Sequence, residues 1–176
     1  MIDINYNKYI KKEILEKFNN YKVDKINNII ERFIIDNNMN GWFYLDEIIN
    51  HEDLKDLTET ANYIKNNSKV FVVIATGGSY LGLKGIIDAL NPYIKSKNLE
   101  TIFIGNNLSS EYLSQVISYI KNKDIAINFI SKSGSTLEPL LAFEQVIDLM
   151  KAKYSKEEIK KRVIITTCNG NRLSKY

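Results

Sequence analysis

Cysteine and histidine are almost absent from this sequence, which has one of each, Cys168 and His51, among 176 residues. A single cysteine rules out an internal disulfide and a metal site built on several thiolates. No run of 18 apolar residues occurs, so no membrane-spanning helix is expected. The opening residues lack the basic start and apolar core of a signal peptide. These absences predict a protein of the reducing cytosol, with no membrane partner.

An excess of charge of one sign is also missing. The 24 lysines and arginines face 21 aspartates and glutamates, which leaves a net charge of +3. Basic residues are spread along the sequence rather than gathered in one stripe, so a nucleic-acid partner is not expected. The short run Lys160-Lys161-Arg162 is interpreted as the solvated end of a helix. Repeats and linkers rich in proline or serine are absent too, and the length suggests one domain.

The first 66 residues carry a helical pattern of apolar side chains. Residues 6–19, 23–36 and 51–66 place them three or four positions apart, which predicts three amphipathic helices. Asn50 is placed to cap the third of these helices. The buried face of that helix is predicted to consist of Leu54, Leu57, Ala61 and Ile64. We therefore expect residues 1–66 to form an α-helical N-terminal segment that packs on the sheet predicted for the rest of the chain.

From residue 67 onward, short apolar runs alternate with helical patterns. Four runs rich in β-branched residues predict strands, at 69–75, 101–105, 125–131 and 162–168. This alternation is typical of an α/β fold with a parallel sheet and helices on both faces. The crossovers should be right-handed, and a flavodoxin-like strand order, 2-1-3-4, is expected. The fourth strand would leave an unpaired edge, so residues 67–176 are interpreted as an α/β domain whose sheet is incomplete.

Two polar loops follow the first and third of these strands. Their sequences are Thr-Gly-Gly-Ser at 76–79 and Ser-Lys-Ser-Gly-Ser-Thr at 131–136. In a doubly wound sheet, loops at the carboxyl ends of adjacent strands open into one crevice, where ligands bind. Each loop also leads into a helix N-terminus, which offers unpaired N–H groups and a positive dipole end to an anion. Because hydroxyl groups and glycine backbone add further donors, the two loops predict a phosphate site.

Nucleotide-binding motifs fit these loops poorly. A P-loop requires lysine directly after its second glycine, but Leu83 follows Gly82 and Lys84 stands one position late. A dinucleotide site requires an acidic residue at the end of the second strand, where this sequence has Gly105-Asn106-Asn107. The plain alternative is that serine and glycine serve only tight turns and helix caps. Two such loops at neighbouring strands make that alternative less favoured than a phosphate site.

Five segments stand out in order along the chain: "NGWFYL" (40–45), "GGSYLG" (77–82), "FIGNNLSS" (103–110), "SKSGSTLEP" (131–139) and "KKRVIITT" (160–167). Together they resemble the bacterial type of the glucose-6-phosphate isomerase family. The resemblance implies a sugar-isomerase (SIS) fold and the interconversion of glucose 6-phosphate and fructose 6-phosphate in glycolysis and gluconeogenesis. It further implies a reaction without cofactor or metal, and a homodimer in the full-length family.

The same resemblance implies roles for particular residues. Four residues of the second loop would hold the phosphate of the sugar: Ser131, Lys132, Ser133 and Thr136. Of these, Lys132 would act mainly through its backbone N–H. The sugar itself would lie against Gly78 and Ser79. Ser135 and Glu138 match the family motif, but no ligand contact is expected of them.

Catalytic residues of the family find no match in this chain. In the family a glutamate moves the proton, a histidine opens the sugar ring, and a lysine and a Gly-Gly-Arg turn complete the site, all downstream of the matched segments. His51 lies far upstream and is interpreted as a surface or cap residue. The resemblance therefore implies the phosphate-binding N-terminal portion of an aldose–ketose isomerase, inactive by itself. The alternative is a stand-alone SIS module that senses a sugar phosphate without catalysis.

Overall fold

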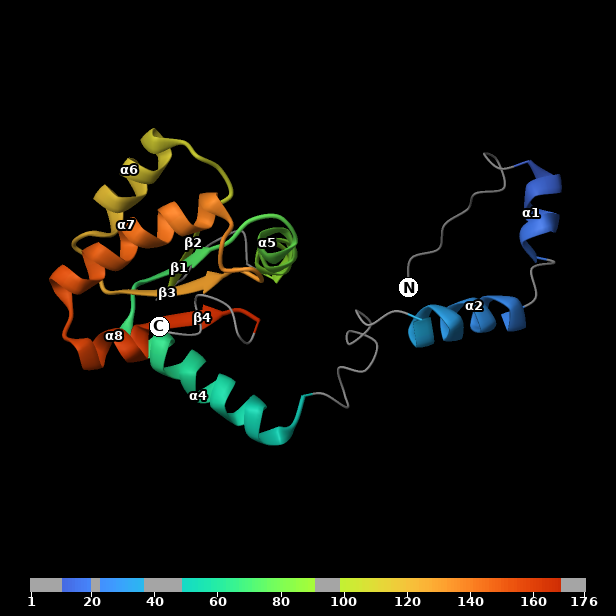
Figure 1. Cartoon of the computed structure of the whole chain (residues 1–176), viewed down its shortest axis with the longest axis horizontal. Coiled ribbons are helices and arrows are strands. Elements are labelled where there is room, and N and C mark those ends of the chain that lie inside the picture. Colours follow the sequence, from blue (N-terminus) through green and yellow to red (C-terminus); the bar gives the residue numbers. More distant parts are fainter. Residues whose placement is uncertain (1–10, 20–22, 37–48, 91–98, 169–176) are drawn as a thin grey trace. The chain divides into compact units, whose positions relative to one another are not determined.

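The computed structural model describes residues 11–19, 23–36, 49–90 and 99–168 (Figure 1). The chain divides into two units, Met1–Leu54 and Lys55–Tyr176. The first contains helices α1 (Lys12–Asn19) and α2 (Val23–Asp36), which confirms the first two predicted helices over the described residues. The domain boundary expected near residue 66, and the packing of the N-terminal segment on the sheet, stay predictions. The "NGWFYL" segment lies outside the described residues.

The second unit alternates strands and helices. Helix α4 (His51–Asn67) leads into it, and its further elements are β1 (Val70–Ile74), α5 (Gly78–Leu90), β2 (Glu100–Ile104), α6 (Ser110–Ile120), β3 (Ile125–Ile130), α7 (Leu137–Lys153), α8 (Lys156–Arg162) and β4 (Val163–Thr166). All four predicted strands therefore form, each close to its predicted bounds. Among the helices that the structure describes, none has the length and apolar character needed to cross a membrane.

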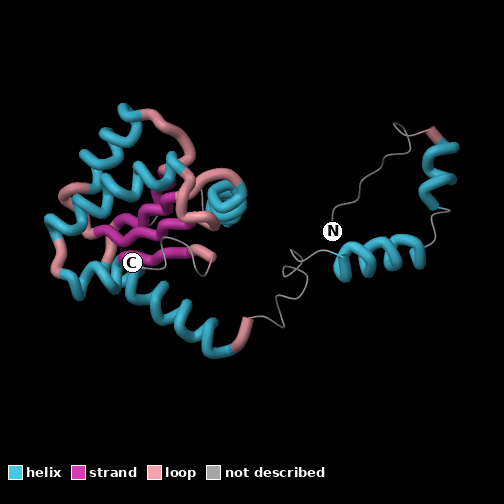
Figure 2. The backbone as a smooth tube through the Cα atoms, viewed as in Figure 1, coloured by secondary structure: helices cyan, strands magenta, loops and turns pink. Residues whose placement is uncertain are grey.

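The four strands form one parallel sheet (Figure 2), in the predicted order β2-β1-β3-β4. Val70 of β1 lies opposite Glu100 of β2 on one side and Ile125 of β3 on the other. β3 in turn pairs with β4, with Ile127 opposite Val163. β2 and β4 are edge strands, so the sheet is open. From β1 the chain first adds β2 on one side and then crosses over to add β3 and β4 on the other side. The position between β1 and β3 is therefore the topological switch point, where α/β proteins bind ligands.

Apolar residues of the strands and of two helices form the core. Val72, Ile74 and Phe129 are fully buried, and α6 and α7 lie together over one face of the sheet (Figure 1). Phe143 of α7 stacks on Phe129, with ring centroids 4.5 Å apart. Burial of a side chain of this size contributes roughly 1.5–3 kcal/mol to stability. This packing holds β1 and β3 in place, and with them the starting points of the loops that follow these strands.

Helix caps form where the sequence places them. The Asn50 side chain accepts a hydrogen bond from the Asp53 N–H at 2.8 Å, and Ser109 caps α6 in the same way. Ser155 and Glu158 form the predicted capping box at the start of α8. Each cap satisfies N–H groups that have no partner within the helix.

The predicted buried face of α4 is wrong for most of its length. Leu54 and Leu57 are 47% and 64% exposed, and Ala61 is exposed as well. Only Ile64, near the end of the helix that leads into β1, is buried. Amphipathic spacing identifies a helix, but it does not show how far along the helix a neighbour covers that face.

The prediction of a solvated basic run at 160–162 is also wrong in part. Lys160 and Lys161 are exposed, but the Arg162 side chain is only 7% exposed. Arg162 is the last residue of α8, and β4 begins at the next residue without a loop. Because the helix ends directly against the sheet, its last side chain is enclosed by the strands and turns around it.

Candidate functional site

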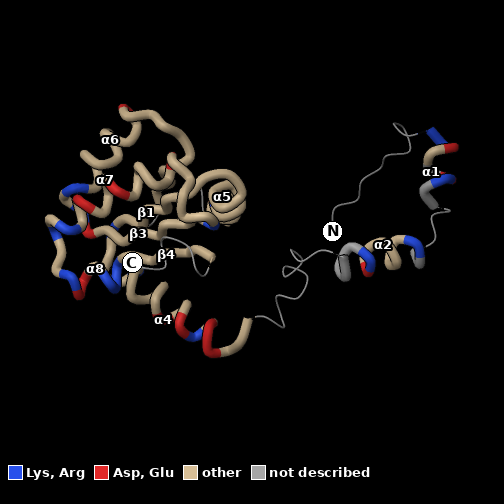
Figure 3. The backbone as a smooth tube through the Cα atoms, in the orientation of Figure 1, with Lys and Arg blue, Asp and Glu red and all other residues tan. Residues whose placement is uncertain are grey.

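The pairing of β1 with β3 brings the two polar loops together at the carboxyl end of the sheet. Ile74, the last residue of β1, lies opposite Phe129 of β3. Since the two strands are parallel, both end on this side of the sheet. The loop after β1 leads to α5, and the loop after β3 leads to α7. Figure 3 shows that most of the described lysines and arginines of this unit lie toward the opposite end of the sheet, near α8. The carboxyl end of the sheet therefore carries polar residues with little charge.

A cavity of about 440 Å³ lies between the two loops. Its lining consists of Thr76, Ser79, Ile130, Ser131, Lys132, Ser133, Thr136 and Cys168. Both loops contribute to one continuous space, so the predicted crevice exists. The four residues expected at the phosphate all line it, and so does Ser79, whereas Gly78 is not among the lining residues.

The second loop is braced by its own serines. The buried Ser131 hydroxyl accepts a hydrogen bond from the Gly134 N–H at 3.1 Å. The Ser133 hydroxyl accepts one from the Ser135 N–H at 3.2 Å and one from the Ser135 hydroxyl at 3.0 Å. Gly134 has a φ of +68°, which a residue with a Cβ rarely adopts. Ser135, for which no ligand contact was expected, thus stabilises the conformation of the loop.

Thr167 is a site residue that the sequence reasoning missed. Its hydroxyl donates a 2.7 Å hydrogen bond to the carbonyl oxygen of Ser131, and the Ser131 N–H donates to the Thr166 carbonyl at 3.1 Å. The end of β4 therefore holds the first residue of the loop that follows β3. The sequence feature that could have indicated this role is the pair of threonines near the end of the fourth predicted strand, which is the expected neighbour of the third strand.

Two helices have their N-termini at the carboxyl end of the sheet. Helix α5 begins at Gly78 after Gly77, whose φ is +56°. Helix α7 begins at Leu137 with Thr136 as its N-cap residue, but the Thr136 side chain makes no capping hydrogen bond. Unpaired N–H groups at these ends and the aligned peptide dipoles favour a negative charge, by about 0.3–1 kcal/mol for each helix. Because the Thr136 hydroxyl makes no capping hydrogen bond, it adds a donor to the cavity.

Groups able to move protons are scarce around the cavity. Among its described lining residues there is one lysine, Lys132, and one cysteine, Cys168, and no histidine or carboxylate is present. His51 is exposed at the start of α4, which confirms the interpretation of a surface residue. Glu138 lines a separate, smaller cavity of about 170 Å³ between α6 and α7. The arrangement is therefore suited to holding an anion rather than to acid–base chemistry.

Comparison with known proteins agrees with this picture. The phosphoglucose isomerase family model matches residues 44–176, which is most of the chain. The chain belongs to the phosphoglucose isomerase family. The cavity between the two loops thus lies within the part that this family shares. Since its relatives are named as isomerases, the alternative of a stand-alone SIS sensor module is not favoured.

Individual relatives show how much of a family member this chain represents. Glucose-6-phosphate isomerase of Mycoplasma mobile is 43% identical over 155 residues, which are 84% of this chain and 36% of that protein. The Staphylococcus saprophyticus enzyme is 42% identical over 129 residues, 72% of this chain and 29% of its own length. The chain therefore spans about a third of the length of the curated relatives it matches.

A solved structure shares the fold. The crystal structure of a hypothetical protein from Thermus thermophilus superposes with a TM-score of 0.66 and 23% sequence identity. The match covers 90% of this chain and 36% of the other. The open parallel sheet with its flanking helices is thus an arrangement already known from experiment.

Proposed function

We propose that the cavity between the two loops binds the phosphate group of a hexose phosphate, and that this chain is the phosphate-binding portion of a glucose-6-phosphate isomerase. The observation that carries the proposal is the single cavity that collects Ser131, Ser133 and Thr136 from one loop and Ser79 from the other. Family membership supplies the substrate class, since the relatives are glucose-6-phosphate isomerases. Glucose 6-phosphate and fructose 6-phosphate are the proposed ligands.

Each part of the site has a proposed role. Hydroxyls of Ser133 and Thr136 donate to the phosphate oxygens, together with the Lys132 backbone N–H. Ser131, whose hydroxyl already binds the Gly134 N–H, contributes mainly by fixing the loop. Ser79 lies toward the sugar, and Gly78, which does not line the cavity, would approach the sugar only where it extends past the cavity. A hydrogen bond to a charged group contributes about 1.5–3 kcal/mol, so a few of them support micromolar-to-millimolar affinity.

Catalysis requires groups outside this cavity. Moving a proton between C1 and C2 of the sugar through an enediol needs a base within hydrogen-bond reach of the carbon-bound proton. No histidine or carboxylate is among the described residues that line the cavity. We infer that the base and the ring-opening acid come from a remaining part of the full-length protein, or from a second subunit of the proposed homodimer. The 176-residue chain alone is expected to bind the substrate without converting it.

Calorimetry with fructose 6-phosphate and with fructose tests the proposal. We expect the chain to bind the phosphate ester and to show no measurable heat with fructose. The variant Ser133→Ala/Thr136→Val should weaken binding by about tenfold or more, because two donors to a charged group are lost. The matched control Thr60→Val/Ser114→Ala makes the same chemical changes at exposed helix positions. Equal affinity of both double variants would refute the proposed phosphate contacts.

A further inference from the structure

A second polar cavity lies at the opposite end of the sheet, where the strands begin. It has a volume of about 440 Å³, and its lining consists of Lys65, Asn66, Asn67, Ser68, Lys69, Asp124 and Arg162. These residues come from the end of α4, the turn into β1, the residue before β3, and the end of α8. None of them belongs to the candidate site between the two loops.

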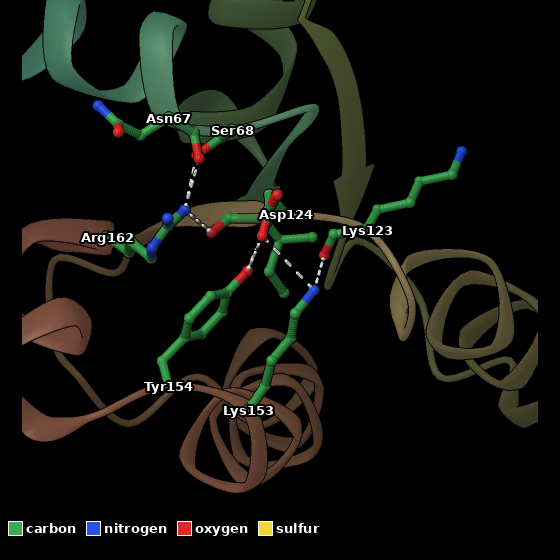
Figure 4. A network of polar contacts seen from close by, with 8 residues as sticks. Asn67, Ser68, Lys123, Asp124, Lys153, Tyr154 and Arg162 are labelled. Carbon is green, nitrogen blue, oxygen red and sulfur yellow. Dashed lines mark hydrogen bonds and ion pairs between the residues drawn. The ribbon is translucent and has the colours of Figure 1, made fainter.

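Arg162 lines this cavity and bonds to several of the segments around it (Figure 4). Its Nη1 donates to the Asn67 carbonyl at 2.7 Å, to the Ser68 hydroxyl at 3.2 Å and to the Ile125 carbonyl at 3.3 Å. The guanidinium also lies over the ring of Tyr154, 4.5 Å from its centroid. These contacts fix the position of the guanidinium at the junction of three segments.

The charge of Arg162 is not balanced by a bonded carboxylate. The side chain is only 7% exposed, and an arginine stays protonated in proteins. Among the described residues, no ion pair joins it to an acidic group. Its Nε is buried and has no hydrogen-bond partner in the described part of the chain. A buried charge with an unpartnered donor is costly unless something else compensates it.

Nearby acidic groups are occupied elsewhere. The Asp124 carboxylate lies 3.8 Å from the Lys153 ammonium and 3.4 Å from the Tyr154 hydroxyl (Figure 4). Glu158 accepts hydrogen bonds from the backbone N–H and the hydroxyl of Ser155. Neither carboxylate forms an ion pair with Arg162, although the charge of Arg162 contributes to lowering the pKa of Glu158.

The charges around the cavity indicate which kind of ligand would fit it. Lys65, Lys69 and Arg162 contribute three positive charges and Asp124 contributes one negative charge, which leaves an excess of two. The ammonium groups of Lys65 and Lys69 are on exposed residues and can turn toward a ligand. An ion with two negative charges and several acceptor oxygens would balance this excess, through contacts with the lysine ammonium groups and through the charge of the guanidinium.

We propose that this cavity is a second anion site, which binds a tetrahedral oxyanion with two negative charges, of the phosphate or sulfate class. The site is separate from the proposed hexose-phosphate cavity and does not depend on it. Its location, beside the turn that starts β1 and the end of the helix before β4, means that a bound anion would join α4, β3 and α8. Stabilisation of the fold by phosphate is the expected consequence, because a ligand that binds only the folded state stabilises it.

Titration of the chain with inorganic phosphate at mildly alkaline pH, followed by backbone amide NMR, tests the proposal. We expect the amide resonances of Ser68 and Lys69 to shift and to saturate at millimolar phosphate. Sulfate should reproduce the shifts, whereas acetate at matched ionic strength should not, because a single charge leaves part of the excess unbalanced. The shifts should persist in Ser133→Ala/Thr136→Val, which separates this site from the proposed substrate site.

The decisive variant is Lys65→Gln/Lys69→Gln, because replacement of Arg162 would disturb the three segments that it joins. We expect the phosphate dissociation constant to rise about 5- to 30-fold through the loss of two charges. Its matched control is Lys151→Gln/Lys160→Gln, which removes the same charge from two lysines that pair with Asp148 and Glu157. The absence of saturable shifts, equal binding of acetate, or equal weakening by both double variants would overturn the proposal.

Discussion

The hydroxyl of Thr167 donates to the carbonyl oxygen of Ser131 across 2.7 Å, and so ties the end of β4 to the loop that follows β3. This bond connects residues 36 positions apart in the sequence. Ser131 is the first residue of the loop proposed to hold phosphate, and its N–H is bonded to Thr166. The two hydrogen bonds fix where the loop starts, and the serines within the loop fix its course.

The first prediction concerns Thr167→Val, which keeps the shape of the side chain and removes its hydroxyl. We expect a loss of about 0.5–1.5 kcal/mol in the free energy of unfolding, the usual contribution of one hydrogen bond. Affinity for fructose 6-phosphate should fall as well, because the loop start is less firmly held. Urea denaturation and calorimetry measure the two effects. Thr167→Ser keeps the donor and should retain affinity, and a Ser variant as weak as the Val variant would contradict this role.

The second prediction uses a pair of glycines. Gly105, just after β2, has a φ of +84°, and a Cβ added there would lie 2.9 Å from the Pro139 Cα of α7. Gly105→Ala should therefore destabilise the chain by more than the roughly 1–2 kcal/mol of a left-handed backbone alone. Gly82, inside α5, has no atom within 4 Å of an added Cβ, and Gly82→Ala should stabilise by about 0.5–1 kcal/mol. Thermal unfolding compares the two, and similar melting temperatures would contradict the close approach at Gly105.

Much of the α/β unit could be predicted from local patterns. Buried strands in a parallel sheet are marked by runs of β-branched residues, and right-handed crossovers leave few possible strand orders. That reasoning placed the 76–79 and 131–136 loops at neighbouring strands, and the structure confirms the shared cavity. Its success came from features that each segment carries by itself.

Contacts between distant segments could not be predicted in this way. A basic run at a helix end is usually solvated, which predicts an exposed Arg162, yet its guanidinium bonds to Asn67, 95 positions away. Thr167 was missed because nothing in its own segment shows that it binds Ser131. The exposure of Leu57 on α4 has the same origin, since burial depends on what the rest of the fold brings to that face. Local sequence defines the elements, and the tertiary arrangement decides which polar groups become partners.

The third prediction concerns pH and the capping box at α8. Hydrogen bonds from the backbone N–H of Ser155, then from its hydroxyl, and the charge of Arg162 hold the pKa of the Glu158 carboxyl below its usual range. A carboxyl with a lowered pKa in the folded state adds stability above its unfolded pKa of about 4.3, and this stability is lost as the pH falls through the folded pKa. Glu158→Gln keeps the acceptor but cannot ionise.

We therefore expect the wild-type chain to exceed the Glu158→Gln variant in stability near neutral pH, with the difference shrinking as the pH falls below about 4.3. Urea denaturation at several pH values measures this difference. Ser155→Ala removes the cap itself and should cost about 0.5–2 kcal/mol at neutral pH. A difference between wild type and Glu158→Gln that grows on acidification would contradict the assigned direction of the pKa shift.

The fourth prediction turns the single cysteine into a reporter of the proposed site. Cys168 is exposed and lines the cavity together with Ser131 and Thr136, and the sequence has no other thiol to react. Iodoacetamide should alkylate it, and fructose 6-phosphate should slow the reaction. At a ligand concentration of about ten times the dissociation constant, we expect the rate to fall by about tenfold if only the free form reacts.

Mass spectrometry of the intact chain follows this alkylation directly. Fructose should give no protection, since it lacks the phosphate that the loop is proposed to hold. Ser133→Ala/Thr136→Val should lose protection at the same ligand concentration, whereas Lys65→Gln/Lys69→Gln should keep it, because those lysines line the other cavity. Protection by fructose, or protection that survives the loss of both hydroxyls, would place the sugar phosphate somewhere other than this cavity.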